Sequence, residues 1–192
     1  ARCLNRGLNC IAVTDHNTIR GAEEVRRIAP FQVIVGEEVR SSEGDIIGLF
    51  LEKEVPRDLS PQDTVEAIKD QGGLVMVPHP FDRVRPSAIK YDALQEILPY
   101  VDIMEAFNCH NIFRRDNDIA AAFIREHRLV AAAVSDSHTP LELGRTYMEV
   151  PEFGGTPEGF KDALSQARLV PRKAHHILRL TSVWAKFKRS FR

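Results

Sequence analysis

The chain has 192 residues, enough for about one domain with a substantial core. Its formal net charge of −1, with 28% charged residues, gives no global electrostatic case for a nucleic-acid or membrane partner. No apolar stretch approaches the roughly 20 residues that a membrane helix needs, and no secretory signal peptide opens the chain. The three cysteines Cys3, Cys10 and Cys109 show no CxxC spacing, so we expect reduced thiols in a cytoplasmic protein.

Short apolar runs alternate with helical patterns along the chain. The runs occupy residues 10–14, 31–35, 46–51, 74–77, 101–104 and 130–134, and helices are expected at 18–28, 60–72, 90–98, 114–127 and 157–167. Ser60 is the expected N-cap of the second of these helices, with Pro61 at its first position. A hairpin turn is expected at Ser42–Asp45, between two strand-like runs. The alternation predicts a single α/β domain with a mainly parallel sheet.

Five of the apolar runs end in residues that suit a metal ion. They lead to Asp15-His16, Glu37-Glu38, His79, Glu105 to His110, and Asp136-Ser137-His138. The carboxyl ends of parallel strands in a barrel converge on one rim, where the chemistry sits. Imidazole and carboxylate groups that meet there form a multi-metal site.

Each of these signals alone has a plainer interpretation. An Asp15-His16 pair is usually a capping or turn feature, and Pro78-His79-Pro80 reads equally well as a rigid turn with a packed histidine. The alternation of side-chain direction along the strand, counted from the preceding apolar residues, does not decide whether Glu37 or Glu38 faces the site. Asp136 and His138 have i, i+2 spacing, which in extended backbone points both side chains to one side.

Taken together, the segments resemble the polymerase and histidinol phosphatase (PHP) superfamily over nearly the whole chain up to about Arg172. The resemblance lies in Ile11 to Gly21, Gly36 to Val39, Val77 to Pro80, Glu105 to Asn108 and Ser135 to Thr139. It implies a distorted (β/α)7 barrel that hydrolyses phosphate esters with two or three divalent ions (Mn, Zn or Fe). The matching ligand positions are His16, Glu38, His79, Asp136 and His138, with His110 near a further one. The family pattern favours Glu38 over Glu37.

One departure from the family pattern concerns the start of the chain. Family members open with a strand that bears a His-x-His pair, whereas no histidine precedes His16 here. Residues 1–8 read as the last turns of a helix that follows such a strand. We therefore expect a barrel domain at 1–172 that lacks its first strand and holds fewer metals. A basic helical extension is expected at 173–192.

The resemblance implies a metal-dependent phosphoesterase in the parent protein, with Asp15, Glu38 and Asp136 as its catalytic carboxylates. Metals would activate water and relieve charge on the phosphoryl oxygens. Arg83 and Arg145 are candidates to contact the phosphate. The expected substrate is a small phosphorylated metabolite or nucleotide. Two alternatives stay open: a non-catalytic module that binds metal or a partner, and an exonuclease that processes nucleic-acid ends, which the near-zero net charge disfavours.

Overall fold

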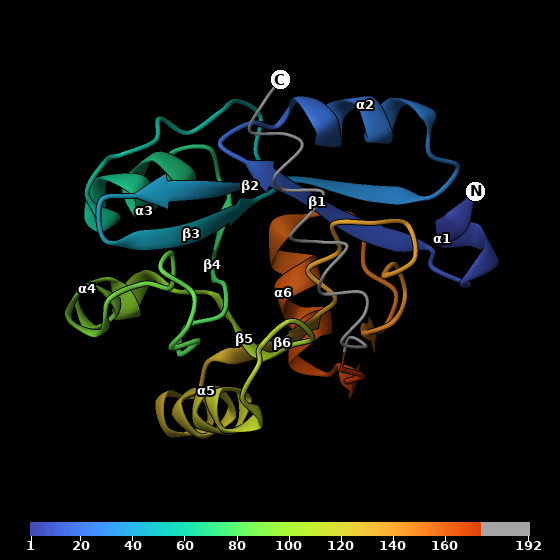
Figure 1. Cartoon of the computed structure of the whole chain (residues 1–192). Coiled ribbons are helices and arrows are strands. Elements are labelled where there is room, and N and C mark those ends of the chain that lie inside the picture. The colour runs from blue at the N-terminus through green and yellow to red at the C-terminus, as the bar shows by residue number, and fades with distance from the viewer. Residues whose placement is uncertain (174–192) are drawn as a thin grey trace.

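The computed structural model describes residues 1–173 (Figure 1). Its helices are α1 (Arg2–Asn5), α2 (Arg20–Ile28), α3 (Pro61–Lys69), α4 (Tyr91–Ile97), η1 (Leu98–Tyr100, a 3-10 helix), α5 (Arg114–His127) and α6 (Pro157–Ser165). Its strands are β1 (Cys10–His16), β2 (Gln32–Ser41), β3 (Gly44–Leu49), β4 (Leu74–Val77), β5 (Ile103–Asn108), β6 (Val130–Val134), β7 (Tyr147–Glu149) and β8 (Arg168–Val170). The predicted α/β alternation is confirmed.

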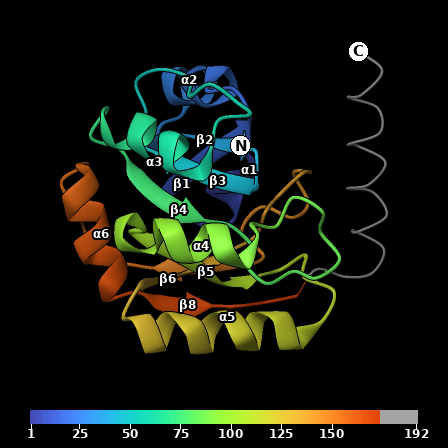
Figure 2. The same ribbon diagram turned by 90° about the vertical axis from the view of Figure 1, so that its left-hand side faces the viewer.

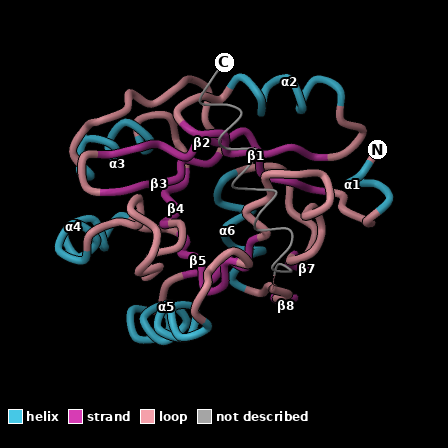
Figure 3. Tube along the Cα trace, in the orientation of Figure 1, coloured by secondary structure: helices cyan, strands magenta, loops and turns pink. Residues whose placement is uncertain are grey.

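The main sheet has six strands in the order β1-β2-β3-β4-β5-β6. β1 and β2 are parallel, as are β4 to β6, while β3 is antiparallel to both of its neighbours. The sheet is curled like half a barrel, with β1 and β6 at its two edges (Figure 3). The described strands therefore form an open curled sheet plus the separate pair β7–β8, where a distorted (β/α)7 barrel without its first strand was expected. The basic helix expected at 173–192 falls almost wholly on residues 174–192, which lie outside the described part.

Local chemistry accounts for the ends of several elements. The Ser60 side chain accepts a hydrogen bond from the backbone N–H of Asp63, and Pro61 occupies the first turn of α3, as predicted. The β2–β3 hairpin turns at Ser42-Glu43, and Gly44 follows with φ +130°, a conformation that side chains rarely adopt. This hairpin is the local antiparallel excursion that interrupts the parallel order.

One hydrophobic core lies between the convex face of the sheet and the helices that cover it. Figure 2 shows α2, α3, α4 and α5 in succession along this outer side. The buried residues of these helices include Ala22, Ile68, Leu94 and Phe123. They pack in one cluster with outward-facing residues of the sheet such as Val75. Among the described residues, no helix is both long enough and apolar enough to cross a lipid bilayer.

A second core lies inside the curl. It contains the strand residues that point to the opposite face of the sheet, and Phe160 of α6 packs against them. These strand residues include Ile34, Ile47, Met76 and Ile103. Successive side chains of a strand point to opposite faces, so the two cores divide the apolar residues of each strand between them. The inward alternation also carries polar residues at the carboxyl ends of the strands, and these form the site described next.

Candidate metal centre

A cavity of about 410 Å³ occupies the inside of the curled sheet. Apolar residues of the inner core, such as Ile34, Met76 and Ile103, line one part of it. Its polar lining comes from the carboxyl ends of the strands and the loops that follow them: His16, Glu38, His79, Glu105, Asp136 and His138. Strand-end residues that are far apart in the sequence thus meet at one end of the cavity, as predicted.

The first group of ligand-type side chains comes from the three adjacent strands β1, β2 and β3. One ligand atom each of His16, Glu38 and Asp45 lies within 4.8 Å of the others. His16 Nδ1 is 3.5 Å from Glu38 Oε2, and the two residues are direct partners in the β1–β2 register. Glu38 shares its inward face with Ile34, whereas Glu37 faces outward and accepts a hydrogen bond from the Val55 N–H. The geometry therefore places Glu38, not Glu37, in the cavity.

Glu38 and Asp45 are two buried carboxyl groups that lie beside each other, with exposed fractions of 8% and 3%. Burial raises the pKa of Asp45, and the neighbouring Glu38 raises it further. Burial acts in the same direction on Glu38, but hydrogen bonding from His79 and the charge of His16 more than offset it, so the Glu38 pKa is lowered. A divalent cation bound here would offset the repulsion between the two carboxylates.

His79 follows β4 and connects this group to β5. Its backbone has φ +31°, an uncommon conformation that functional sites often contain. Its Nε2 lies 3.2 Å from Glu38 Oε1, and its backbone N–H donates to Glu105 Oε2 at 2.7 Å. Glu105 is itself 4% exposed, and burial raises its pKa to about 7.

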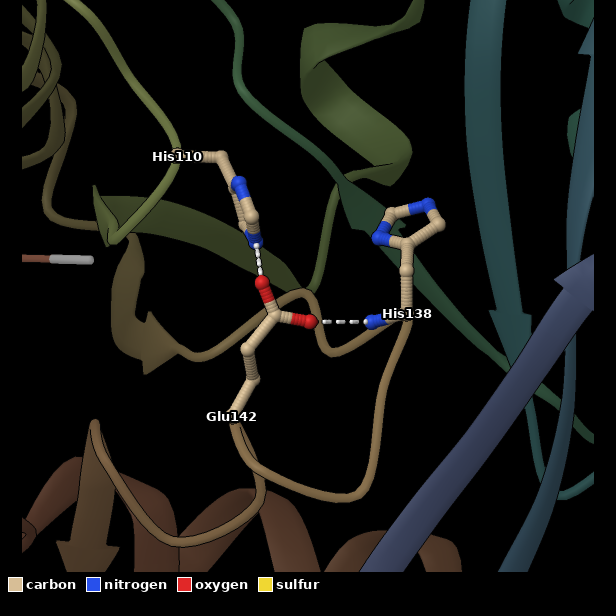
Figure 4. A group of neighbouring side chains, drawn as sticks. All are labelled: His110, His138 and Glu142. Atoms are coloured by element: carbon tan, nitrogen blue, oxygen red, sulfur yellow. Dashed lines mark hydrogen bonds and ion pairs between the residues drawn. The ribbon is translucent and has the colours of Figure 1, made fainter. Parts of the chain in front are cut away.

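The second group of ligand-type side chains consists of His110, His138 and Glu142, from the loops after β5 and β6. One ligand atom of each lies within 4.8 Å of the others. His110 Nε2 is 3.2 Å from Glu142 Oε1, and the other Glu142 oxygen accepts the backbone N–H of His138 at 2.9 Å (Figure 4). That oxygen also accepts the N–H and the hydroxyl of Thr139. Glu142 therefore fixes the loop that carries His138.

Asp136 interacts electrostatically with residues of both groups, namely Glu38 of the first and His110 and His138 of the second. Its Oδ2 accepts hydrogen bonds from Arg85 Nη1 at 2.9 Å and from Asn108 Nδ2 at 3.3 Å. Burial would raise its pKa, but Arg85 and then His138, His110 and His79 outweigh burial and hold the pKa well below its usual range. Asp136 has φ +45°, so the chain turns sharply before His138.

The residues present fit a divalent metal ion. His79 Nδ1 is buried without a hydrogen-bond partner among residues 1–173, which leaves one imidazole nitrogen without a described donor or acceptor. His138 Nδ1 lies 2.8 Å from the backbone oxygen of Asp136, which places the proton on Nδ1 and leaves the electron pair of Nε2 for a ligand bond. Mixed imidazole and carboxylate donors suit zinc, manganese or iron.

The remaining predicted site residues belong to neither ligand group, although Asp15 lies among the residues that line the cavity. Asp15 is on the face of β1 opposite His16, where its carboxylate lies so close to Gly21 of α2 that a Cβ there would be 2.1 Å from Oδ2. Arg83 pairs with the buried Asp116 at 2.8 Å, and Arg145 donates to the backbone oxygen of Lys173. The Arg145 backbone N–H also donates to the backbone oxygen of Glu142 at 3.0 Å, so Arg145 contacts the second ligand group through its backbone.

Five residues of the site were given no role from the sequence: Asp45, Arg85, Glu105, Asn108 and Glu142. Glu105 and Asn108 belong to a strand end that the sequence pattern marks, so their position was available from the sequence. Asp45 could have been found from its alternation with Ile47 and Leu49 in the hairpin strand. Arg85 and Glu142 lie in loops, for which periodicity gives no signal.

Comparison with known proteins supports the interpretation of the fold. Residues 114–169 match the PHP-associated family model. The uncharacterized protein MJ1587 of Methanocaldococcus jannaschii is 45% identical over 82 residues, which cover 41% of this chain and 48% of that protein. The uncharacterized protein MJ0417 of the same organism is 33% identical over 147 residues, covering 74% of this chain and 58% of that protein. The chain thus spans about half the length of these relatives.

Solved structures share the fold at low sequence identity. A two-domain protein from Bacteroides vulgatus that contains a predicted PHP-like metal-dependent phosphoesterase has a TM-score of 0.66 at 20% identity, covering 95% of this chain and 61% of that one. PsfC from Pseudomonas syringae has a TM-score of 0.68 at 15% identity, covering 98% and 86%. Endonuclease Q in complex with a duplex that carries an abasic lesion has a TM-score of 0.61 at 17% identity, covering 86% and 50%. The match to the PHP-associated family model over residues 114–169 and the fold shared with a PHP-like protein support membership of the PHP superfamily.

Proposed function

We propose that this chain carries the metal site of a phosphoester hydrolase that acts on a small phosphorylated substrate. The observation that carries the proposal is the convergence of histidine and carboxylate side chains from separate strands at one end of a single cavity. The fold shared with a predicted metal-dependent phosphoesterase and with endonuclease Q supports the same general chemistry.

The two convergent groups define where divalent ions would bind. His16, Glu38 and Asp45 would hold one ion, and His110, His138 and Glu142 another. Divalent ions bound there would supply Lewis acidity, which lowers the pKa of water toward neutrality and offsets charge on phosphoryl oxygens.

Residues of the chain itself orient the ligands and hold protons. Glu38 lies within 3.5 Å of both His16 and His79, so it ties the side chains of two strand ends together. Glu142 accepts three hydrogen bonds from the backbone of His138 and from Thr139, which fixes the loop that carries His138. Glu105, with a pKa of about 7, can hold or release a proton near neutral pH while it binds the His79 backbone.

The size of the cavity favours a small substrate. Its volume of about 410 Å³ falls in the range of roughly 300–1,000 Å³ that is typical of small-molecule sites. A nucleic-acid substrate is the second candidate, favoured only by the fold shared with endonuclease Q. The formal net charge of −1 does not favour a long phosphate-backbone contact.

The test is phosphate release from nitrophenyl phosphate and from nucleoside monophosphates with added manganese, beside cleavage of end-labelled single-stranded and duplex DNA. We expect release from the small esters, loss of activity on chelation, and a decrease of at least about 100-fold in the His138→Ala variant. The matched control is His127→Ala, an exposed histidine at the end of α5, which should keep full activity. DNA cleavage without monoester hydrolysis would favour the nuclease. The absence of both activities in metal-loaded full-length protein would reject hydrolysis.

A further inference from the structure

Two arginines in the loop after β4 take opposite directions. Arg83 points outward, where it pairs with Asp116 and lies over the Phe113 ring at 5.2 Å. Arg85 points inward, and its side chain is 17% exposed. Within residues 1–173, Arg85 is the arginine whose ion pairs include a residue of the candidate metal centre, Asp136. Of these two arginines, Arg85 is the one that contacts Asp136, whereas the side chain of Arg83 pairs with Asp116.

The Arg85 guanidinium lies between two buried carboxylates. Its Nη1 donates to Asp136 Oδ2 at 2.9 Å, and its Nε is 3.5 Å from Oδ2 of Asp82, which is 4% exposed. The loop itself is closed by backbone hydrogen bonds from the Arg85 N–H to the Asp82 oxygen and from the Ala88 N–H to the Arg85 oxygen. Arg85 is therefore held from its own loop while it reaches the loop after β6.

The Asp136 carboxylate is bound asymmetrically. Oδ2 accepts from both Arg85 and Asn108, whereas the contact described for Oδ1 is a longer one, 3.7 Å from His138 Nδ1. One oxygen is thus fixed by the protein, and the other faces the histidine of the second ligand group.

We propose that Arg85 is a positioning residue that holds Asp136 by one carboxylate oxygen, so that the other oxygen can bind a divalent ion at the candidate metal centre. The inference rests on the proposed metal site. Carboxylates that bind metals are commonly oriented by hydrogen bonds from outside the metal's immediate ligands, and loss of such a partner weakens metal binding by about 10- to 100-fold.

Repulsion between the Arg85 guanidinium and a bound cation opposes this role, but the negative charge of Asp82 offsets that repulsion. The Asp82–Arg85 pair is neutral as a unit, so the charge of Asp136 remains available to a cation. A lysine at position 85 would keep the charge, but its single ammonium group cannot reproduce the planar fork that contacts two carboxylates.

The experiment measures manganese binding and steady-state kinetics in the full-length protein with Arg85→Gln, Arg85→Lys, Asp82→Asn and, as a control, Arg125→Gln on the exposed side of α5. We expect Arg85→Gln to weaken one class of manganese site by about 10- to 100-fold. Its kcat should fall at limiting manganese and recover at excess manganese, with the KM for the ester little changed. Arg85→Lys should give a smaller loss in the same direction and keeps the test open if Arg85→Gln does not fold.

Three outcomes separate the possibilities. Unchanged manganese affinity with a raised KM in both Arg85 variants would overturn the proposal and make Arg85 a substrate contact. Tighter manganese binding in Arg85→Gln would also overturn it, because it would mean that the guanidinium competes with the ion. If the unmodified protein binds manganese at neither ligand group, the proposed metal site itself fails, which is distinct from either result.

Discussion

Glu37 and Glu38 are neighbours in β2 whose carboxylates lie on opposite faces of the sheet. Glu38 faces the cavity beside His16 and His79, and Glu37 lies beneath the helices, where it accepts the Val55 N–H. Both are buried: Glu38 is 8% exposed and Glu37 is 0% exposed. The two side chains therefore differ in the face of the sheet to which they point, and Glu37 can serve as the matched control for Glu38.

The first prediction uses this pair. Glu38→Gln should abolish the tight divalent-ion site formed with His16 and Asp45 and reduce phosphoesterase kcat by at least about 100-fold, because an amide cannot supply the anionic ligand. Glu37→Gln should leave metal binding intact. Calorimetric titration with manganese measures both. Equal losses in the two variants would mean that the cavity-facing assignment of Glu38 is wrong.

The second prediction concerns the hairpin that positions Asp45. A Cβ on Gly44 would lie 2.3 Å from the Ile89 Cα atom, and φ there is +130°. Gly44→Ala should therefore lower the free energy of unfolding by about 3 kcal/mol or more.

Gly72→Ala is the control for the hairpin variant. Gly72 has φ +70°, but a Cβ added there would meet no atom within 4 Å, so only the left-handed backbone is penalised, by about 1–2 kcal/mol. Urea unfolding compares the two. A Gly44→Ala variant no less stable than Gly72→Ala would contradict the close packing of the hairpin on the loop before α4.

The third prediction concerns Asp102, which anchors two helices to the sheet at the end opposite the metal centre. It binds Lys161 Nζ at 2.8 Å, Lys69 Nζ, and the Val75 N–H. Burial would raise its pKa, but Lys161, Lys69 and the Val75 N–H more than offset burial and lower the pKa from its ordinary 3.8. A lowered folded-state pKa contributes stability above the unfolded-state pKa and loses it as the pH falls through the folded-state pKa.

Asp102→Asn should thus destabilise the protein by about 2–4 kcal/mol at neutral pH. The difference from the unmodified protein should shrink as the pH falls below about 4. Thermal unfolding over a pH series measures it, with the exposed Asp118→Asn as the control. A difference that stays constant down to low pH would show that the ion pairs are not its cause.

The fourth prediction concerns Glu142, a loop residue that no pattern in the sequence marks. Its Oε2 accepts from the N–H groups of His138 and Thr139 and from the Thr139 hydroxyl, and its Oε1 lies beside His110. Glu142→Ala should release the loop and weaken the second ion site by about 10- to 100-fold, with the first site unchanged. Manganese titration resolves the two sites. Loss of both, or of neither, would refute the separate roles of the two groups.

The elements were largely predictable because their patterns are local. β4, β6 and α5 occupy the expected residues, and Ser60 caps α3 as predicted. The strand-end histidines were predictable because parallel strands bring their carboxyl ends together. The alternation of side chains along a strand predicts which residues share a face of the sheet, but it did not decide whether Glu37 or Glu38 faces the site.

Contacts that depend on loop conformation were not predictable. Arg83 and Arg85 differ by two positions in an irregular loop, and only the fold shows that Arg85 turns toward Asp136. Glu142 reaches back four residues to His138 through a turn that follows no repeat. Alternation with Ile47 assigns Asp45 to the inward face, but its position near Glu38 depends on the register of the hairpin, which brings β3 alongside β2.

Two groups of side chains, which line the cavity through His16, Glu38 and His138, are proposed to bind one divalent ion each. The most direct measurement is anomalous diffraction at the manganese absorption edge from crystals grown with manganese. We expect peaks among His16, Glu38 and Asp45 and among His110, His138 and Glu142. Crystals of manganese-loaded protein with no peak at either group, or with peaks only elsewhere, would show that these side chains do not form the metal centre.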